Sequence, residues 1–568
     1  MPLKPMFSRA PLTRQPLAPL APEHIRLEGP AAETLERLCA LAASTPMTAE
    51  LAEGALTCAY LQHNEELAAN AEKWLWTQLA EQREDGGLPG DTETNLRLML
   101  AAARLYAHTG EKGLLEQMMH YCAFLRKHWD EVRLDGSVMA QAANLMELLT
   151  FLYNVTGKKA LLHLMEMTRQ DAMDWSGLLT TFAMSRPTGK TVALDEMEQG
   201  RRAEGNDPGG FYTRQYYATF GPALAQGMRM TALSGLYSGS ARDLAAGVIG
   251  YEKIMRYHGT ACGAFTSDLH LAGGSPSAAV SGWAAGETLR ALARNWQITE
   301  KEQAAAAMAR LLTNAVPAFL PDGKLLPFLR VNSLSVNCGT KDCFAPGEAD
   351  QTAVRTLGAL LCGFAAAVRS AVTVTEDGVC VSMYLPGTYK LRVKGEKAKL
   401  HVAAEGEKII LTLEAEKDVE LTAKVYIPAW AKDACVQLND EGGDAPAAGK
   451  LFKVPGKLRG GDLVTVLLPC ETRMEEGYHQ SVSVLRGDEL LAYPVTEEHW
   501  RVALVTAKDG AEAPVAALKR VTEWNTRVHT PADPPIAPKC EGEAFEAALA
   551  PFAQTVCRVA AFPKGKQA

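Results

Sequence analysis

A helix-ending signature recurs at a fixed interval in the first two-thirds of this chain. The segment Arg104-Leu-Tyr-Ala-His-Thr-Gly-Glu-Lys-Gly-Leu-Leu115 returns 47 residues later as Phe151-Leu-Tyr-Asn-Val-Thr-Gly-Lys-Lys-Ala-Leu-Leu162, with looser copies at Gly235 and Leu292. Each clear copy ends a helix after an aromatic residue, turns at a glycine that can adopt positive φ, and begins the next helix. A period of 45 to 50 residues made of paired helices predicts an array of helical hairpins, because one hairpin cannot bury its apolar face alone.

Residues 30–370 carry this pattern throughout. They are rich in Ala, Leu, Met and Glu, with apolar residues at three- and four-residue steps, as in Leu98, Ala101, Ala102 and Leu105. A segment of this length holds about six or seven hairpins. We expect a closed (α/α)6 helical toroid, because closure removes the need for capping repeats, and an irregular helical bundle is the alternative. Residues 1–29, which are rich in proline, are expected to form an N-terminal arm.

The hydrophobic period changes from helical to alternating near residue 371. Ala371-Val-Thr-Val-Thr alternates, Asp377-Gly378 is a hairpin turn, and the next residues alternate again. Similar stretches occur at Lys408–Leu413, Val419–Ile427, Leu463–Leu468 and Val482–Leu485. We therefore predict an α+β multidomain protein, with residues 371–568 forming one or two antiparallel β-sandwich domains after the toroid.

Composition excludes several classes of function. The net charge is −8, so no overall positive field would attract nucleic acid. The longest apolar run, Leu357–Val368, is too short to span a bilayer, and the first thirty residues hold no signal-peptide core. Twelve scattered cysteines suit free thiols in a reducing compartment. We expect a cytoplasmic protein with no membrane partner.

Several motifs, taken in order, resemble one known family. They are Gln82-Arg-Glu-Asp-Gly86, Met255-Arg-Tyr-His-Gly259, the segment from Gly263 to His270, Ile427-Pro-Ala-Trp430 and Leu485-Arg-Gly487. Their order and spacing resemble glycoside hydrolase family 127, the β-L-arabinofuranosidase type. This resemblance implies a helical toroid with β-sandwiches and a substrate that is an arabinofuranoside or a related small glycan.

The catalytic residues of that family are not found at the matching positions. The resemblance implies a zinc-bound cysteine nucleophile with glutamate and cysteine ligands, and a separate glutamate as acid/base. Here Asp268-Leu269-His270 has leucine at the acid/base position, Ser281-Gly282-Trp283 stands where the family has Glu-x-Cys, and Asp350-Gln351 stands where it has two adjacent cysteines. The thiol mechanism is therefore predicted to be absent.

The sequence offers two sets of residues that could replace the zinc–thiolate chemistry. Cys338 and Cys343 could share a zinc ion, but no histidine or third cysteine is close in sequence, so we predict no metal and no other cofactor. Glycosidases ordinarily use two carboxylates about 5 to 9.5 Å apart. We name Asp268 and Asp350 as candidate catalytic residues, with Glu348 as the alternative partner. In the other interpretation Asp268 caps a turn, and Glu348 and Asp350 lie in a solvated loop.

Candidate substrate-binding residues are His258, His270, Trp283, Tyr212 and Glu287. Neutral imidazoles bond to sugar hydroxyls, and aromatic faces pack on sugar rings. Two hypotheses stay open: a glycoside hydrolase with an altered carboxylate-based site, and a non-catalytic relative that binds a sugar or a partner. A lyase or isomerase using a histidine base is a third. The expected partner is a small glycan, and the sequence leaves a homodimer open.

Overall fold

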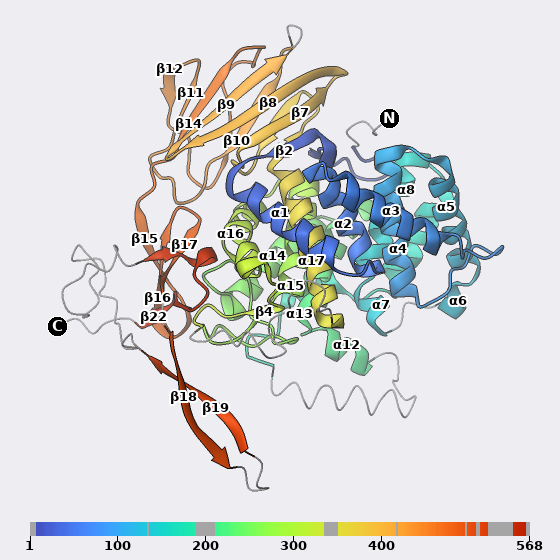
Figure 1. Cartoon of the computed structure of the whole chain (residues 1–568). Helices are drawn as coiled ribbons and strands as arrows, with labels where there is room; N and C mark the ends of the chain where they lie inside the picture. The colour runs from blue at the N-terminus through green and yellow to red at the C-terminus, as the bar shows by residue number, and fades with distance from the viewer. Residues whose placement is uncertain are drawn as a thin grey trace.

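Figure 1 shows the fold of the whole chain as a computed structural model. The structure describes residues 7–132, 136–188, 211–333, 350–415, 419–494, 497–506, 512–520 and 549–563. The expected positions Cys338, Cys343 and Glu348 lie outside these ranges, as does the side chain of Tyr212, whose backbone belongs to α12 (Phe211–Tyr217).

Six helices of the described residues form a closed inner ring. In ring order each contacts the next, and the last contacts the first. A second set of six helices packs outside them, one beside each inner helix. The helical part is therefore a closed toroid, as expected. The inner helices are α2 (Ala49–Gln62), α4 (Thr92–Thr109), α8 (Ala143–Thr156), α13 (Gly221–Ser238), α15 (Gly282–Thr299) and α17 (Gln351–Ala371). The outer helices are α1 (Gly29–Ser44), α3 (Glu65–Leu79), α5 (Lys112–Lys127), α9 (Lys159–Asp171), α14 (Ala241–His258) and α16 (Glu302–Ala318).

The recurring sequence signature marks the ends of inner helices. Gly110, Gly157 and Gly239 follow α4, α8 and α13 with φ of 73°, 69° and 71°, and each amide closes the last turn. This left-handed conformation favours glycine because it crowds a Cβ. The copy beginning at Leu292 lacks the glycine, and Glu300 takes the same conformation after α15, with φ of 54°.

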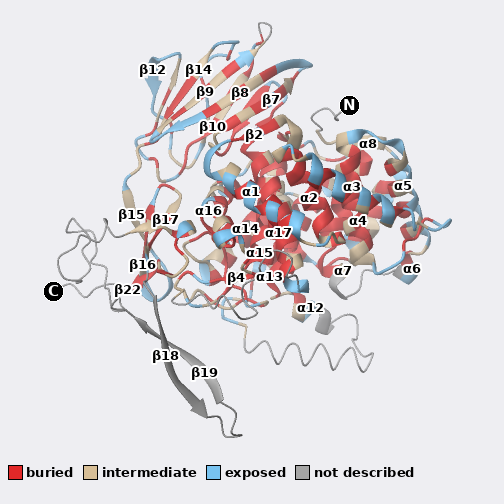
Figure 2. Ribbon diagram, in the orientation of Figure 1, coloured by how far each residue is buried: buried red, intermediate tan, exposed pale blue. Residues whose placement is uncertain are grey.

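Glycines allow the inner helices α15 and α17 to pack backbone against backbone. A Cβ on Gly286 would lie 2.3 Å from the carbonyl carbon of Ala359, and one on Gly363 would lie 2.2 Å from the carbonyl oxygen of Gly286. Helix α17 has the length and apolar character of a membrane span, yet most of it is buried between α15 and α2. Figure 2 shows the same burial along the inner helices.

The β-sandwich consists of a five-stranded and a seven-stranded sheet. The arm contributes one edge strand to each sheet: β1 (Ala18–Pro19) pairs with β5 (Val372–Val374), and β2 (Ile25–Leu27) pairs with β7 (Gly387–Val393). Pairing is antiparallel except between β6 (Gly378–Val381) and β10 (Thr422–Tyr426), which run parallel. The other strands are β8 (Glu396–Glu405), β9 (Lys408–Ala415), β11 (Cys435–Leu438), β12 (Glu441–Asp444), β13 (Leu451–Lys453) and β14 (Leu463–Leu467).

A smaller sheet follows the sandwich and has its own core. It contains β15 (Thr472–Glu476), β16 (Ser481–Arg486) and β17 (Glu489–Pro494), with the short strands β20 (Ala550–Pro551), β21 (Arg558–Val559) and β22 (Phe562–Pro563) added to it. Val482, Val484, Leu491 and Phe562 form its separate apolar cluster. Arg310 of α16 bonds to both carboxylate oxygens of Glu475 on β15, at 3.1 and 2.6 Å, and so ties this sheet to the toroid. The strands β18 (Glu497–Thr506) and β19 (Glu512–Arg520) form a hairpin.

Candidate functional site at the start of the inner helices

Ser281 and Asp350 are the N-caps of two neighbouring inner helices. The Ser281 hydroxyl accepts a hydrogen bond from the Ala284 amide of α15 at 3.3 Å. The Asp350 carboxylate accepts one from the Ala353 amide of α17 at 2.8 Å. Serine and aspartate are preferred at this position because their side chains bond otherwise unpaired helix amides. The positions that the resemblance assigns to zinc ligands therefore hold two capping residues together with Trp283 and Gln351, and these side chains do not fit a thiolate–zinc group.

Asp268 lies in the loop that precedes α15 and is exposed. Its carboxylate accepts a hydrogen bond from the Ala279 amide at 3.0 Å. The next residue, Leu269, has φ of 90°, and its carbonyl accepts a bond from the Gly221 amide at the start of α13. The loop is thus tied to the same end of the toroid as Asp350. The catalytic roles of Asp268 and Asp350 stay predictions, and both carboxylates have a local structural task.

An aromatic cluster lies beside these helix starts. The His270 ring is 4.5 Å from that of Tyr216 and 5.6 Å from that of Phe220, and its Nδ1 lies 2.8 Å from the Thr219 hydroxyl. Trp283 packs edge-to-face on Phe220 at 5.5 Å. On α17, the half-buried Arg355 holds its guanidinium 5.2 Å from the centre of the Trp283 ring. Trp283 and His270, both expected to bind substrate, are thus brought together by Phe220.

His258 lies apart from this cluster and is fully buried. Its Nε2 donates to the carbonyl of Met184 at 2.6 Å, and its Nδ1 accepts a bond from the Gly273 amide at 3.0 Å. Burial lowers the pKa of the imidazole, although the bond to Met184 opposes the shift. Because both ring nitrogens are engaged, this histidine holds the loop to α14 and has no free nitrogen for a sugar hydroxyl.

Glu287 is buried one helical turn beyond Trp283 on the inner face of α15. Its Oε1 accepts a hydrogen bond from Gln226 at 3.1 Å, and its Oε2 lies 3.6 Å from Arg229. Gln226 also bonds to Gln141 at 3.0 Å. Glu287 therefore lies between Trp283 of the aromatic cluster and Arg229, which belongs to a network of charged side chains along the toroid axis.

That axial network joins two glutamates to three arginines. Glu53 receives two bonds from Arg290, both of 2.8 Å, and one from Arg104 at 3.1 Å. Glu147 receives bonds from Arg229 at 2.9 Å and Arg104 at 3.2 Å, with Arg290 at 3.4 Å. Burial alone would raise the pKa of Glu147, but Arg290, Arg229 and Arg104 hold it well below its usual value. The network joins five inner helices, α2, α4, α8, α13 and α15, across the axis through ion pairs.

Sequence reasoning missed these residues, although the sequence carries a signal for them. Arg229 is the single charged residue of α13, and Glu147 is the single charged residue of α8. A lone charge in a mostly apolar helix that is buried along its length is expected to be paired.

The described thiols do not reproduce the chemistry implied by the resemblance. The nine cysteines described are free, and burial raises the pKa of Cys39, Cys122 and Cys362 to about 12. Within the described residues no group of three or more His, Cys, Asp or Glu side chains could hold a metal ion. A buried thiol with a raised pKa is a poor nucleophile, because the thiolate is the reactive form.

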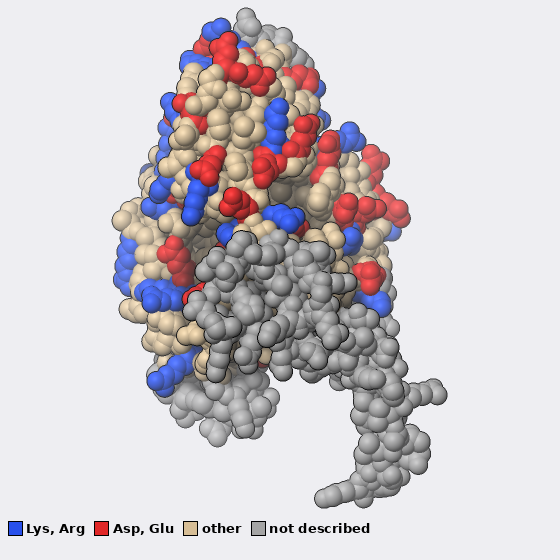
Figure 3. All heavy atoms as spheres, turned by 90° about the vertical axis from the view of Figure 1, so that its left-hand side faces the viewer, with Lys and Arg blue, Asp and Glu red and all other residues tan. Residues whose placement is uncertain are grey.

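Two cavities lie away from the helix starts. One, of about 190 Å³, lies at the opposite end of the toroid. The other is a groove of about 1030 Å³ between the toroid and the small sheet, lined in part by Tyr257, Trp430, Arg473, Tyr478 and Asp488. Figure 3 faces the side that carries this sheet and shows the surface hollowed beneath the sandwich, with acidic and basic side chains around the hollow. Neither cavity is lined by a described candidate catalytic or substrate-binding residue, although residues of the motifs Met255–Gly259 and Ile427–Trp430 line the groove.

Comparison with known proteins gives a consistent answer on fold. No protein-family model and no curated protein sequence matches the chain. Among solved structures, one titled a glycoside hydrolase has 14% identity and a TM-score of 0.70, covering 99% of this chain and 100% of its own. A β-arabinofuranosidase of glycoside hydrolase family 127 has 12% identity and a TM-score of 0.64, with 97% and 98% covered. The family 127 β-L-arabinofuranosidase from Geobacillus stearothermophilus T6 has 15% identity and a TM-score of 0.58, with 93% of each chain covered. The chain therefore has the fold of the family 127 β-L-arabinofuranosidases over nearly its whole length, at low sequence identity.

Proposed function

We propose that the protein binds a small glycan, an arabinofuranoside or a related furanoside, at the N-terminal ends of α13, α15 and α17, and that it does so without zinc–thiolate chemistry. The observation that carries this proposal is the grouping of Trp283, Arg355 and His270 at these helix starts. Aromatic faces and guanidinium donors are the groups with which proteins hold sugars. The likeness to arabinofuranosidase structures supports the choice of glycan.

The geometry favours binding over catalysis. Asp268 and Asp350 are exposed and bonded to backbone amides, and Glu287 lies 3.6 Å from the guanidinium of Arg229. A glycosidase needs a carboxyl group directed at the glycosidic oxygen, and each of these three carboxylates has a structural partner instead. The proposed site can therefore orient a sugar but lacks a described general acid.

A carboxylate-based glycoside hydrolase is the second candidate. One observation favours it, because both carboxylates lie at the same end of the toroid. Asp350 caps α17, and the loop of Asp268 is held to the start of α13 by the bond from Gly221 to Leu269. In that function the two carboxylates, or one of them with Glu348, would flank the glycosidic bond.

Calorimetric titration with methyl β-L-arabinofuranoside and turnover of 4-nitrophenyl β-L-arabinofuranoside separate these functions. We expect saturable binding, no turnover, and at least tenfold weaker binding in Arg355→Met, because hydrogen bonds from a charged donor contribute about 1.5–3 kcal/mol. Arg126→Met, at an exposed position of α5, is the matched control. Turnover that is lost in Asp350→Asn would establish the hydrolase instead. Absence of both binding and turnover would contradict both functions.

A further inference from the structure

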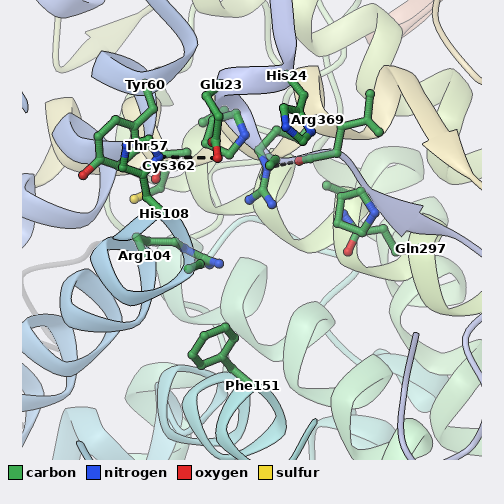
Figure 4. A pocket seen from close by; sticks show the side chains of 18 of the residues that line it. Glu23, His24, Thr57, Tyr60, Arg104, His108, Phe151, Gln297, Cys362 and Arg369 are labelled. Atoms are coloured by element: carbon green, nitrogen blue, oxygen red, sulfur yellow. Dashed lines mark hydrogen bonds and ion pairs between the residues drawn. The ribbon is translucent and has the colours of Figure 1, made fainter. Parts of the chain in front are cut away.

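The cavity of about 190 Å³ at the C-terminal ends of the inner helices has a wall and a roof (Figure 4). Five inner helices, α2, α4, α8, α15 and α17, form its wall. Residues 19–24 of the N-terminal arm and the side chains of Lys390 and Arg392 on β7 form its roof. The roof is fastened by the pairing of β1 and β2 with the sandwich sheets and by the bond from Arg369 Nε to the Leu20 carbonyl, 2.8 Å long. We call this cavity the roofed chamber, defined by Arg104, Arg290, Arg294, Arg369, Lys390 and Arg392.

Positive charge exceeds negative charge in the roofed chamber. Its lining includes those six basic residues but only three glutamates, Glu23, Glu53 and Glu147. The last two are already bonded to Arg104 and Arg290 in the axial network. Glu23 lies 3.4 Å from His108 Nδ1, the one ion pair seen for it among the described residues. Six basic side chains thus face three carboxylates, and positive charge stays in excess.

Arg294 and Arg369 bond only to uncharged acceptors within the described residues. Arg294 donates to the side-chain oxygen of Gln297 at 2.9 Å, and its Nε is buried without a hydrogen bond. Arg369 donates to the carbonyl of Leu20. Burial lowers the pKa of both, that of Arg369 to about 10, and the positive charge of Arg104 adds to each shift. The negative charge of Glu147, and for Arg369 also that of Glu23, opposes these shifts without cancelling them, and a bound anion would raise both pKa values.

The rest of the lining suits an organic body attached to the anionic group. The rings of Tyr60 and His108 stack at 3.9 Å, and Phe151 and the polar side chains Thr57 and Asn154 also line the chamber. One water position needs about 10–15 Å³ of such space, so the chamber has room for roughly a dozen or more atoms.

We propose that the roofed chamber binds a small organic anion of about that size, through an oxyanion held by Arg294 and Arg369. The oxyanion is that of a phosphate monoester or of a carboxylate. This site is distinct from the proposed glycan site, because the two lie at opposite ends of the toroid. Along α15 a single inner face connects them: Trp283 and Glu287 lie at one end, and Arg294 and Gln297 at the other.

The test is calorimetric titration of the full chain with inorganic phosphate, ribose 5-phosphate and glucuronate, together with the shift in melting temperature that each produces. We expect at least one organic anion to bind saturably and more tightly than inorganic phosphate. Arg294→Gln should weaken that binding by about tenfold to hundredfold, because it removes a charged hydrogen-bond donor. Arg126→Gln, outside the chamber, should leave it unchanged.

The arms of the experiment identify the source of the oxyanion. Preference for ribose 5-phosphate assigns a phosphate monoester, and preference for glucuronate assigns a carboxylate. The double variant Lys390→Gln/Arg392→Gln acts at the roof, on partly exposed side chains, and should also weaken binding if Arg294→Gln fails to fold. Absence of saturable binding by all three probes, or binding that none of the chamber variants weakens, would overturn the proposal and leave these arginines a structural role only.

Discussion

Removing the charge of Glu147 tests whether the axial network is an interdependent set of buried ions. In Glu147→Gln, Arg229, which is fully buried, loses its 2.9 Å partner, and Arg104 and Arg290 each lose one of their two carboxylates. Breaking a buried pair by removing one partner costs about 3–5 kcal/mol, because the remaining charge is left uncompensated. For a toroid of roughly 340 residues this corresponds to a melting temperature lower by about 4–7 °C.

The assay is scanning calorimetry at several pH values. Because the folded pKa of Glu147 lies well below its ordinary value of 4.5, its contribution to stability is fully present above that value and is lost as the pH falls through the folded pKa. The difference between wild type and Glu147→Gln should therefore be constant near neutrality and shrink in acid. Glu166→Gln, in a surface pair with Arg169, is the matched control and should cost under about 1 kcal/mol. Equal melting temperatures for wild type and Glu147→Gln at pH 7 would refute the reasoning.

Three further outcomes are expected. Asp350→Asn should abolish any glycosidase activity and leave the melting temperature within a few degrees, because asparagine also caps helices. Asp350→Ala should lower the free energy of unfolding by about 1 kcal/mol. Unchanged turnover in the Asn variant would remove Asp350 from a mechanism. Gly286→Ala should destabilise the toroid by about 3 kcal/mol or more in urea unfolding, because its Cβ would overlap the backbone of α17. Gly113→Ala is the control and should be neutral or stabilising, because its Cβ would make only ordinary contacts. His258 should stay neutral in an NMR titration well below pH 6.5, and stability should fall in acid as the unfolded chain takes up that proton; an imidazole that titrates near 6.5 would contradict its buried bonding.

The axial ion pairs join the inner helices across the centre of the toroid at the level of Glu53 and Glu147. Large side chains from α2, α4, α8, α13 and α15 meet there and bond to one another. Space remains at the C-terminal end, where the surplus arginines lie. The division of the axis into an aromatic end, a charged middle and a basic chamber follows from the order of side chains along α15.

The sequence by itself determined the helical hairpins and the change to strands near residue 371, and the number of hairpins favoured closure into a toroid. These features depend on local periodicity and on glycine at helix ends, and Gly110 and Gly157 end helices where the repeat predicted. Only the tertiary structure decided what the polar side chains do, because Ser281 and Asp350 are read as caps once their amide partners are known. The pairing of Glu53 with Arg290, 237 residues apart, joins distant helices across the axis, and no local pattern specifies which charges will meet.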